Sequence, residues 1–369
     1  MKFKSGFVSI IGRPNAGKST LMNALVGEKV AIVTAKPQTT RTRIHGILEI
    51  PARKGKHPAA QIVFVDTPGV HRPNSSLDKR MMQEVYDALE TRDAVLLIVD
   101  ATRRLDLPGL AQEKREETSA GLVIESADGA EVTRSTAKRE SGRGEQSEDA
   151  VVFDLLRKLD CPVFLLINKI DLIERTKLLP LIQQLSSLYS FAEVIPISAR
   201  KRDGLDRLLE KLIDVLPEGQ RYFPKDQFTD QPERFLVAEL IREKILTETG
   251  EEVPYASAVV VERFEEPRPS AKKPKAGDKL PVTKIAAAIY CERQGQKAIL
   301  IGKGGSKLKA IGTAARKEIE SLLGTRVFLE LHVIVKENWR ESRGFVESLD
   351  WRRQLEQLTP VEPLGEGEK

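Results

Sequence analysis

One segment of the chain, Gly12–Ser19, has the residue types and spacing needed to hold a polyphosphate. Its sequence GRPNAGKS fits the pattern G-x-x-x-x-G-K-[ST], and it lies between an apolar run and a helical stretch. In such a loop, backbone N–H groups and a helix N-terminus face the phosphates. We therefore predict that Lys18 contacts the β- and γ-phosphates and that Ser19 offers its hydroxyl oxygen to Mg²⁺. A glycine-rich turn matches this pattern by chance often enough that other motifs must support it.

Two further segments supply groups for the metal and the γ-phosphate. In QTTR (Gln38–Arg41) we predict Thr40 as the second hydroxyl ligand of Mg²⁺, with Thr39 beside it as the alternative. In DTPG, Asp66 ends an apolar run and is predicted to hold Mg²⁺ through a water. Gly69 lacks a Cβ, so its backbone N–H is expected to approach the γ-phosphate. Lys18, Thr40 and Gly69 are the predicted catalytic residues.

The base is expected to be read by NKID and a serine–alanine pair further along the chain. The carboxylate of Asp171 accepts from the N1–H and 2-amino groups of guanine, a pattern that adenine lacks. The backbone N–H of Ala199 is expected to donate to the guanine O6. The predicted nucleotide-binding residues are Gly12, Asn15, Ala16, Gly17, Lys18, Ser19, Thr20, Asp66, Asn168, Lys169, Asp171, Ser198 and Ala199.

The composition limits the class of protein. The chain has 369 residues, enough for about two domains on the usual size prior, and 40% of them are hydrophobic, enough for a packed core. Its net charge of +5 favours a polyanionic partner. Cys161 and Cys291 stand far apart, which argues against a disulfide framework or a zinc cluster. The start of the chain shows no signal-peptide pattern and the apolar runs are short, so we expect a protein of the reducing cytosol.

Short apolar runs alternate with helical stretches over residues 1–216. This alternation predicts an α/β domain with a mostly parallel sheet, whose strands carry ligand-binding motifs at their carboxyl ends. The expected strands are Phe7–Ile11, Ile62–Val65, Ala94–Val99, Val163–Ile167 and Val194–Ile197. An insertion at about 103–149 interrupts the domain, and its Asp-Gly turn predicts a protruding hairpin. A solvated loop is favoured over contact with a partner, both there and for the Pro- and Lys-rich loop 265–281.

A second, small α+β domain is expected after a linker at 217–231. Residues 232–345 show the order α-β-β-α-α-β, and the tail 346–369 is expected to be partly disordered. Between the last two helices stands GKGG, which matches the G-x-x-G loop that clamps single-stranded RNA. From Lys297 to Lys317 there are six basic residues and no acidic ones, which favours a polyanion there. The predicted RNA-binding residues are Gly302, Lys303, Gly304, Gly305, Lys307 and Lys309.

Taken together, these segments resemble the translation-factor-related GTPases and, with the second domain, the Era family of ribosome-assembly GTPases. That family joins one P-loop GTPase domain to a C-terminal type II KH domain. The resemblance implies GTP hydrolysis with Mg²⁺, with GTP and GDP as ligands. It also implies binding to 16S rRNA near its 3′ end, in small ribosomal subunit maturation. It further implies a monomeric, cytoplasmic protein with peripheral contact at the inner membrane. The matching stretches are GRPNAGKSTLMNAL, PQTTRTRIHGI, FVDTPGVHRP, NKIDLI, PISARKRDGLDRLLE, IGKGGSKLKAIGTAARKEIE and LELHVIVKENWR.

One residue departs from the pattern of many related GTPases. Val70 follows DTPG where relatives place a glutamine that orients the attacking water, so we expect slow intrinsic turnover. A related group of GTPases, similar at Asn15 and across Thr34–Thr40, uses K⁺ instead of an arginine finger. We therefore expect the Asn15 side chain and backbone carbonyls near Thr34 to ligate K⁺; the alternative is that Asn15 merely braces the loop.

Two other functions remain as alternatives at this point. A P-loop phosphotransferase acting on a small metabolite needs no NKID segment, and an RNA-binding adaptor would use GTP only as a structural ligand. The segments expected to change with nucleotide state are Val33–Gly46 and Gly69–Asn74, which flank the γ-phosphate.

Overall fold

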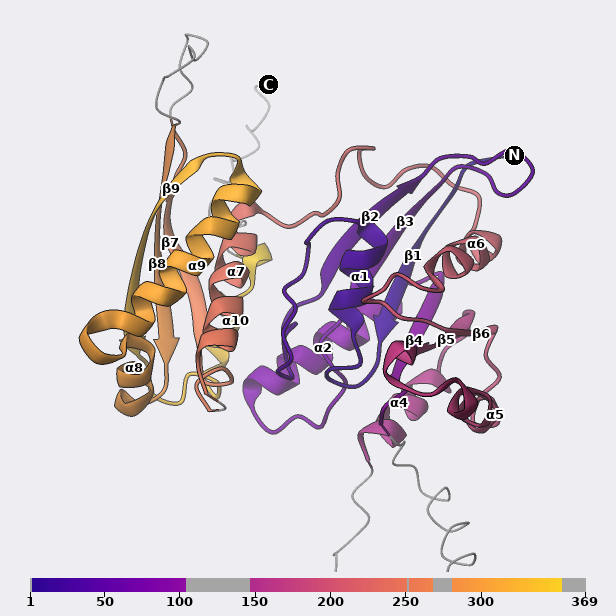
Figure 1. The fold of residues 1–369 in the computed structure, drawn as a ribbon, viewed down its shortest axis with the longest axis horizontal. Helices are drawn as coiled ribbons and strands as arrows, with labels where there is room; N and C mark the ends of the chain where they lie inside the picture. The colour runs from indigo at the N-terminus through magenta and orange to yellow at the C-terminus, as the bar shows by residue number, and fades with distance from the viewer. Residues whose placement is uncertain (1, 104–146, 251, 268–280, 354–369) are drawn as a thin grey trace, which may run out of the picture.

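The structure, a computed structural model, describes residues 2–103, 147–250, 252–267 and 281–353. These residues form two domains, one on each side of Figure 1, joined by a segment that runs from α6 to α7. The predicted hairpin in the insertion, most of the loop 265–281 and the end of the chain lie outside the described residues.

A six-stranded sheet forms the centre of the N-terminal domain. Its strands lie in the order β2-β3-β1-β4-β5-β6, with β2 antiparallel to β3 and the other neighbours parallel. The mostly parallel sheet confirms the prediction. The strands are β1 (Lys4–Ile11), β2 (Ile44–Ile50), β3 (Ala60–Asp66), β4 (Ala94–Asp100), β5 (Val163–Asn168) and β6 (Glu193–Pro196).

The edge strand β2 was not among the expected strands. Its sequence IHGILEI mixes a glycine and two polar residues with apolar ones, so it shows neither a buried run nor a strict alternation. Its first three residues belong to the 33–46 segment that was expected to be mobile. The part of that segment free to change therefore ends at about Arg43, because Ile44 is already paired with Asp66.

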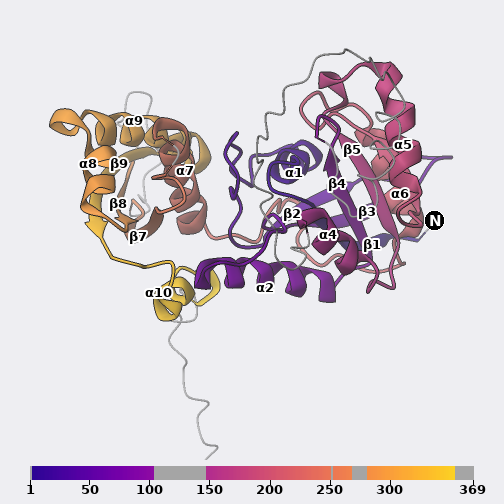
Figure 2. The same ribbon diagram turned by 90° about the horizontal axis from the view of Figure 1, so that it is seen from below.

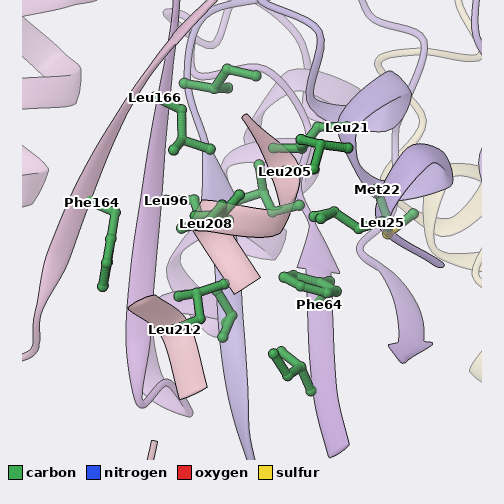
Figure 3. Close-up of a cluster of buried hydrophobic side chains, with 14 of the residues drawn as sticks. Leu21, Met22, Leu25, Phe64, Leu96, Phe164, Leu166, Leu205, Leu208 and Leu212 are labelled. Atoms are coloured by element: carbon green, nitrogen blue, oxygen red, sulfur yellow. The ribbon is translucent and has the colours of Figure 1, made fainter. Parts of the chain in front are cut away.

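Helices cover both faces of the sheet. They are α1 (Lys18–Val26), α2 (Ser76–Glu90), α4 (Glu148–Leu156), α5 (Leu178–Ser186) and α6 (Leu205–Val215), with 3₁₀ turns at Ile170–Leu172 and Arg175–Lys177. Figure 3 shows one face, where α1 and α6 place Leu21 and Leu208 against Leu96 of β4. On the other face, α2, α4 and α5 pack on the next residue of the same strand, Leu97. Successive strand residues thus enter opposite cores, as expected for a sheet covered on both sides.

The segment predicted as a linker is held against the N-terminal domain. Ser5 N donates to Pro217 O (3.2 Å), and Gly219 N donates to Phe3 O (3.1 Å). Further on, the side-chain oxygen of Gln61 accepts from Tyr222 N (2.9 Å) and Phe223 N (3.1 Å). These bonds fix much of residues 217–231 along the sheet.

The C-terminal domain has a three-stranded sheet with helices on one face. Its elements follow the predicted order α-β-β-α-α-β: α7 (Glu233–Glu248), β7 (Ala258–Glu265), β8 (Val282–Cys291), α8 (Gln294–Ile301), α9 (Ser306–Leu323) and β9 (Arg326–Val335). β8 lies in the middle, antiparallel to β7 and parallel to β9. Ile241, Ile289 and Ile311 are fully buried between the sheet and the helices.

A further helix, α10 (Arg343–Ser348), lies between the two domains beside one end of α2 (Figure 2). Val346 and the fully buried Trp339 pack with Leu77 and Met81 of α2. This helix runs across the boundary expected at residue 345. Residues 346–353, expected as the start of a tail, are therefore packed because their apolar side chains cover α2.

Candidate functional site

The predicted phosphate-binding loop connects β1 to α1 at the carboxyl edge of the sheet. Lys18 is 6% exposed, and its Nζ donates to the carbonyl oxygens of Gly12 (3.1 Å) and Arg13 (3.0 Å). Burial lowers the pKa of Lys18 from 10.5 to about 8, against an opposing effect of the Asp66 charge. A phosphate is a stronger acceptor for this ammonium group than two carbonyls. The lysine is thus already placed at the loop, where its ammonium group has two carbonyl partners for its three N–H donors.

Three oxygen-bearing side chains from three segments meet beside this loop. Ser19 Oγ lies 2.9 Å from Thr40 Oγ1 and 2.7 Å from Asp66 Oδ2, and Thr40 Oγ1 lies 3.0 Å from the same carboxylate oxygen. The other oxygen of Asp66, Oδ1, is buried and makes no hydrogen bond within the described part of the chain. Burial raises the pKa of the Asp66 carboxyl, although Lys18 lowers it. Oxygen ligands of this kind suit a small divalent cation.

This arrangement fits Mg²⁺, with Ser19 and Thr40 as hydroxyl ligands and Asp66 acting through a water. The hydroxyl group of Thr39 turns away and donates to Lys36 O (3.0 Å), so the structure favours Thr40 over the alternative. No group of three or more His, Cys, Asp or Glu side chains forms another metal site among the described residues.

The DTPG segment packs closely on the phosphate-binding loop. Val70 N donates to Gly12 O (3.1 Å), and a Cβ on Gly69 would lie 2.7 Å and 2.8 Å from atoms of Pro14. A glycine at position 69 is therefore required for this approach. The Val70 side chain is fully buried in the core beside Ile11, so it is directed away from the phosphates.

His71 braces the same segment. Its Nδ1 lies 2.7 Å from Gly69 O and its Nε2 lies 3.0 Å from Asp78 Oδ1. Both partners are acceptors, so both ring nitrogens carry protons and the ring is an imidazolium. The Asp78 hydrogen bond raises the pKa of His71. Burial raises the pKa of Asp78, but hydrogen bonds from His71, Ser75 and Asn74 to its carboxylate outweigh burial and lower the pKa to about 2.

The base loop is tied to the phosphate-binding loop by two residues. Asn168 Nδ2 donates to Ala16 O (2.9 Å). Lys169 Nζ donates to Asn15 O (2.9 Å) and to Asp100 Oδ2 (2.6 Å). The two loops that must hold opposite ends of a nucleotide are thus fixed relative to each other.

The predicted guanine contacts lie beside this junction. Ser198 Oγ donates to Asp171 Oδ1 (2.7 Å), which lowers the pKa of Asp171 and keeps it ionised as the predicted contact requires. The Ala199 N–H, predicted to serve the guanine O6, donates to Asn168 Oδ1 (3.0 Å) in this structure. Its contact with a base stays a prediction.

Two neighbouring cavities lie beside the predicted phosphate and metal groups. The first, of about 280 Å³, is lined by predicted residues from all the phosphate and metal segments, among them Asn15, Gly17, Lys18, Ser19, Thr20, Thr40, Gly69 and Lys169. The second, of about 980 Å³, extends past His71 to Tyr255 and Arg340 of the second domain. Both cavities are lined by Pro14, Asn15, Gln38 and Arg103.

Asn15 Nδ2 donates to Ala35 O (2.9 Å), which is a bracing contact.

The predicted RNA clamp is a tight turn between α8 and α9. Gly302, Gly304 and Gly305 have φ angles of 72°, 58° and 78°, in a region that favours glycine. Lys303 and Lys309 are exposed beside the turn, while Lys307 Nζ donates to Glu248 O (2.7 Å). The turn thus leaves backbone and two ammonium groups accessible to a phosphate chain.

Comparison with known proteins identifies the family. A family model described as 50S ribosome-binding GTPase matches residues 7–106, and one described as KH domain matches residues 252–340. The chain is 42% identical over 349 residues to GTPase Era of Geobacter metallireducens, covering 95% of this chain and 98% of that protein. It is 44% identical over 347 residues to GTPase Era of Lacticaseibacillus paracasei, covering 94% of this chain and 96% of that protein. The chain belongs to the Era family of GTPases.

Solved structures of Era match across both domains. One, described as Era in complex with MgGDPNP and nucleotides 1506–1542 of 16S ribosomal RNA, has a TM-score of 0.75 at 35% identity and covers 95% of this chain and 99% of that one. Another, a variant of Aquifex aeolicus Era bound to GDP·AlF₄⁻, has a TM-score of 0.72 at 34% identity. The match covers 94% of this chain and 99% of that one.

In this Era-family chain the 33–46 segment also touches the KH domain, which the sequence did not reveal. The Thr39 carbonyl accepts from Arg242 of α7, and Val33 N donates to Glu243 Oε1 (3.1 Å). Arg41 donates to Ser257 O (2.7 Å), and its guanidinium lies 5.7 Å from the ring centre of Trp339. Thr40, the predicted metal ligand, therefore stands between two residues bound to the other domain.

Proposed function

We propose that this Era-family chain hydrolyses GTP to GDP and phosphate and binds 16S rRNA near its 3′ end in the maturation of the small ribosomal subunit. The observation that carries the proposal is the meeting of Ser19, Thr40 and Asp66 beside Lys18, in a chain that also carries the GKGG turn. The solved relative bound to MgGDPNP and a 16S rRNA fragment supports it.

The chemistry assigned to each group follows from its place. Mg²⁺, when bound, bridges phosphate oxygens and neutralises their charge. Lys18 contacts the β- and γ-phosphates, and the Gly69 N–H faces the γ-phosphate. His71 holds the Gly69 carbonyl and so fixes the peptide between Gly69 and Val70, which follows the Gly69 N–H. Asp171 selects guanine over adenine, which the phosphotransferase alternative does not require. The relatives named GTPase Era favour hydrolysis over a purely structural use of GTP.

The contacts of Thr39, Thr40 and Arg41 give the two domains a means to sense the nucleotide. Thr40 Oγ1 donates to Asp66 at the predicted metal site, while Arg242 donates to the Thr39 carbonyl and Arg41 donates to carbonyls of the 254–257 loop. A ligand shifts a conformational balance only through contacts that differ between the states. Loss of the γ-phosphate would change the metal site to which Thr40 is assigned, and with it the backbone that the KH domain contacts.

Potassium is the first testable part of this function. We expect faster GTP turnover in KCl than in NaCl, because Asn15 and the carbonyls near Thr34 offer oxygen ligands beside the phosphates. Asn15→Ala is expected to remove the difference between the two salts. Steady-state phosphate release at matched ionic strength measures it. Equal turnover of the parent in both salts would leave Asn15 with only the bracing role that its bond to Ala35 shows.

The RNA clamp is tested by one pair of variants. Gly304 has a φ of 58°, which Asp and Asn both tolerate, and a Cβ there meets nothing within 4 Å. Gly304→Asp is therefore expected to weaken binding about 10-fold relative to Gly304→Asn, because only the carboxylate repels phosphates. Fluorescence anisotropy with a fragment of nucleotides 1506–1542 measures the affinity, at several salt concentrations. The GTP turnover of both variants should equal that of the parent.

If Gly304→Asp and Gly304→Asn bound this RNA with equal affinity, the turn would not contact the phosphate backbone of the RNA. An effect that shrinks as salt rises supports a phosphate contact.

The remaining predictions from the resemblance are a monomeric state, a cytoplasmic location and peripheral contact with the inner membrane. Within the described ranges, no helix is long and apolar enough to cross a bilayer. Gel filtration of the purified chain tests the monomeric state, and a dimer would contradict it. Flotation with anionic vesicles tests the membrane contact, and a chain that does not float with the vesicles would contradict that.

A further inference from the structure

GTP hydrolysis needs a group that directs a water molecule at the γ-phosphorus, and the residue that often does so is missing. Val70 has no polar atom on its side chain, and it is fully buried in the core. His71 follows it, but both ring nitrogens are bound, one to Gly69 O and the other to Asp78. Neither side chain is available to a water beside the γ-phosphate.

The border between the two cavities is the place to look for a replacement. Four residues line both cavities, namely Pro14, Asn15, Gln38 and Arg103. Proline has no polar side-chain atom, and arginine has no acceptor for a water proton. Asn15 Nδ2 donates to Ala35 O, and the side-chain oxygen of Asn15 is the predicted K⁺ ligand. Gln38 is half-buried, and within the described part of the chain no hydrogen bond to its carboxamide is found.

The backbone at Gln38 is held in an uncommon conformation. Its φ of 58° lies in the left-handed region, which is strained for a non-glycine residue and is found more often at functional sites. The neighbouring residue holds this turn in place, since Thr39 Oγ1 donates to Lys36 O (3.0 Å) and Thr39 O accepts from Arg242. The strained turn carries the Gln38 side chain to the cavity border, two residues before Thr40.

We propose that Gln38 orients the attacking water, from the loop that carries Thr40 instead of from the position after DTPG. This inference rests on the proposed GTP hydrolysis. The side-chain carbonyl oxygen of Gln38 accepts a hydrogen bond from the water, which turns a lone pair of the water toward the γ-phosphorus. The water oxygen bonds to phosphorus while the bond to the β–γ bridging oxygen breaks and its electron pair leaves with GDP. One water proton stays on the attacking oxygen, and the other moves to a phosphate oxygen. Gln38 keeps its own protons throughout.

The test uses the full chain with GTP and Mg²⁺ in single-turnover hydrolysis. Gln38→Ala and Gln38→Gly are both expected to slow hydrolysis on the order of 100-fold, since a positioned group contributes about that much. The affinity for GDPNP should stay within about 3-fold of the parent, because the water contact is made only in the transition state. Binding of GDP·AlF₄⁻, which mimics that state, should weaken in parallel with the rate.

The glycine variant separates the side chain from the backbone. Glycine adopts the left-handed conformation without strain, so Gln38→Gly removes the side-chain carboxamide and keeps the turn. Parental hydrolysis in Gln38→Gly, or a loss of GDPNP affinity as large as the loss of rate, would overturn the proposal. If the parent itself released no phosphate above the Lys18→Ala blank, the proposed function would fail first, and this inference with it.

Discussion

Lys18→Ala is expected to bind neither GTP nor GDP at concentrations that saturate the parent. The ammonium group is buried at the phosphate-binding loop, where burial lowers its pKa to about 8 but leaves it mostly charged at neutral pH. Removing one partner of a buried, hydrogen-bonded charge pair costs about 2–5 kcal/mol, or roughly 30- to 4,000-fold in affinity. Because both the β- and γ-phosphates lose this partner, the loss should lie toward the upper end. Titration calorimetry with GDP and GDPNP measures it.

A thermal shift experiment shows whether the Lys18→Ala fold is intact. Without nucleotide, Lys18 bonds among the described residues only to the Gly12 and Arg13 carbonyls, so the variant should unfold near the melting temperature of the parent. Added GTP raises the melting temperature of a protein that binds it, and that rise should be absent from the variant. Retention of nucleotide affinity within 10-fold of the parent would show that Lys18 does not reach the phosphates.

Asp171→Asn is expected to change which base the chain accepts. The carboxylate accepts from both the N1–H and the 2-amino group of guanine, whereas an amide presents one acceptor and one donor. Xanthine keeps the N1–H but carries an oxygen at position 2, so it matches the amide. A site built around a hydrogen-bonding pattern strongly rejects a mismatched one. We expect GTP affinity to fall by about 100-fold or more, and xanthosine triphosphate to bind more tightly than GTP.

Competition between the two nucleotides for a fluorescent GDP analogue measures this exchange. Asp154→Asn is a matched control, because it removes a surface carboxylate that pairs with Arg157 and lies away from the predicted site. The assignment of the base-reading residue is wrong if Asp171→Asn retains its preference for GTP.

The groups that bind phosphate and metal were predictable because each lies in a short, continuous motif. Lys18 and Ser19 follow their glycine loop directly, and Asp66 ends a fully buried strand. A local pattern is enough to find such residues, since the carboxyl ends of parallel strands meet at one edge. The sheet itself was predictable for the same reason, from apolar runs of strand length.

The contacts between the domains were not predictable from local patterns. Arg41 and Ser257 are more than 200 residues apart, and nothing near Arg41 indicates a carbonyl partner. His71 is one of four histidines in the sequence, and its role depends on α2 bringing Asp78 next to the DTPG segment. The edge strand β2 was missed because a glycine and polar residues interrupt its pattern. In each case a tertiary partner supplies what the sequence pattern lacks.

The hydrogen bonds between the KH domain and residues 33–43 decide which part of the chain is suitable for kinetic work. An excised N-terminal domain, ending before Pro232, has no Arg242, Glu243 or Ser257 to hold the Thr39 carbonyl, the Val33 amide and the Arg41 guanidinium. Its loop around Thr40 then keeps its contacts within the N-terminal domain, such as those of Thr40 with Ser19 and Asp66, but loses those with the KH domain. Kinetic constants obtained on such a fragment describe a differently tethered loop and should not be transferred to the whole protein.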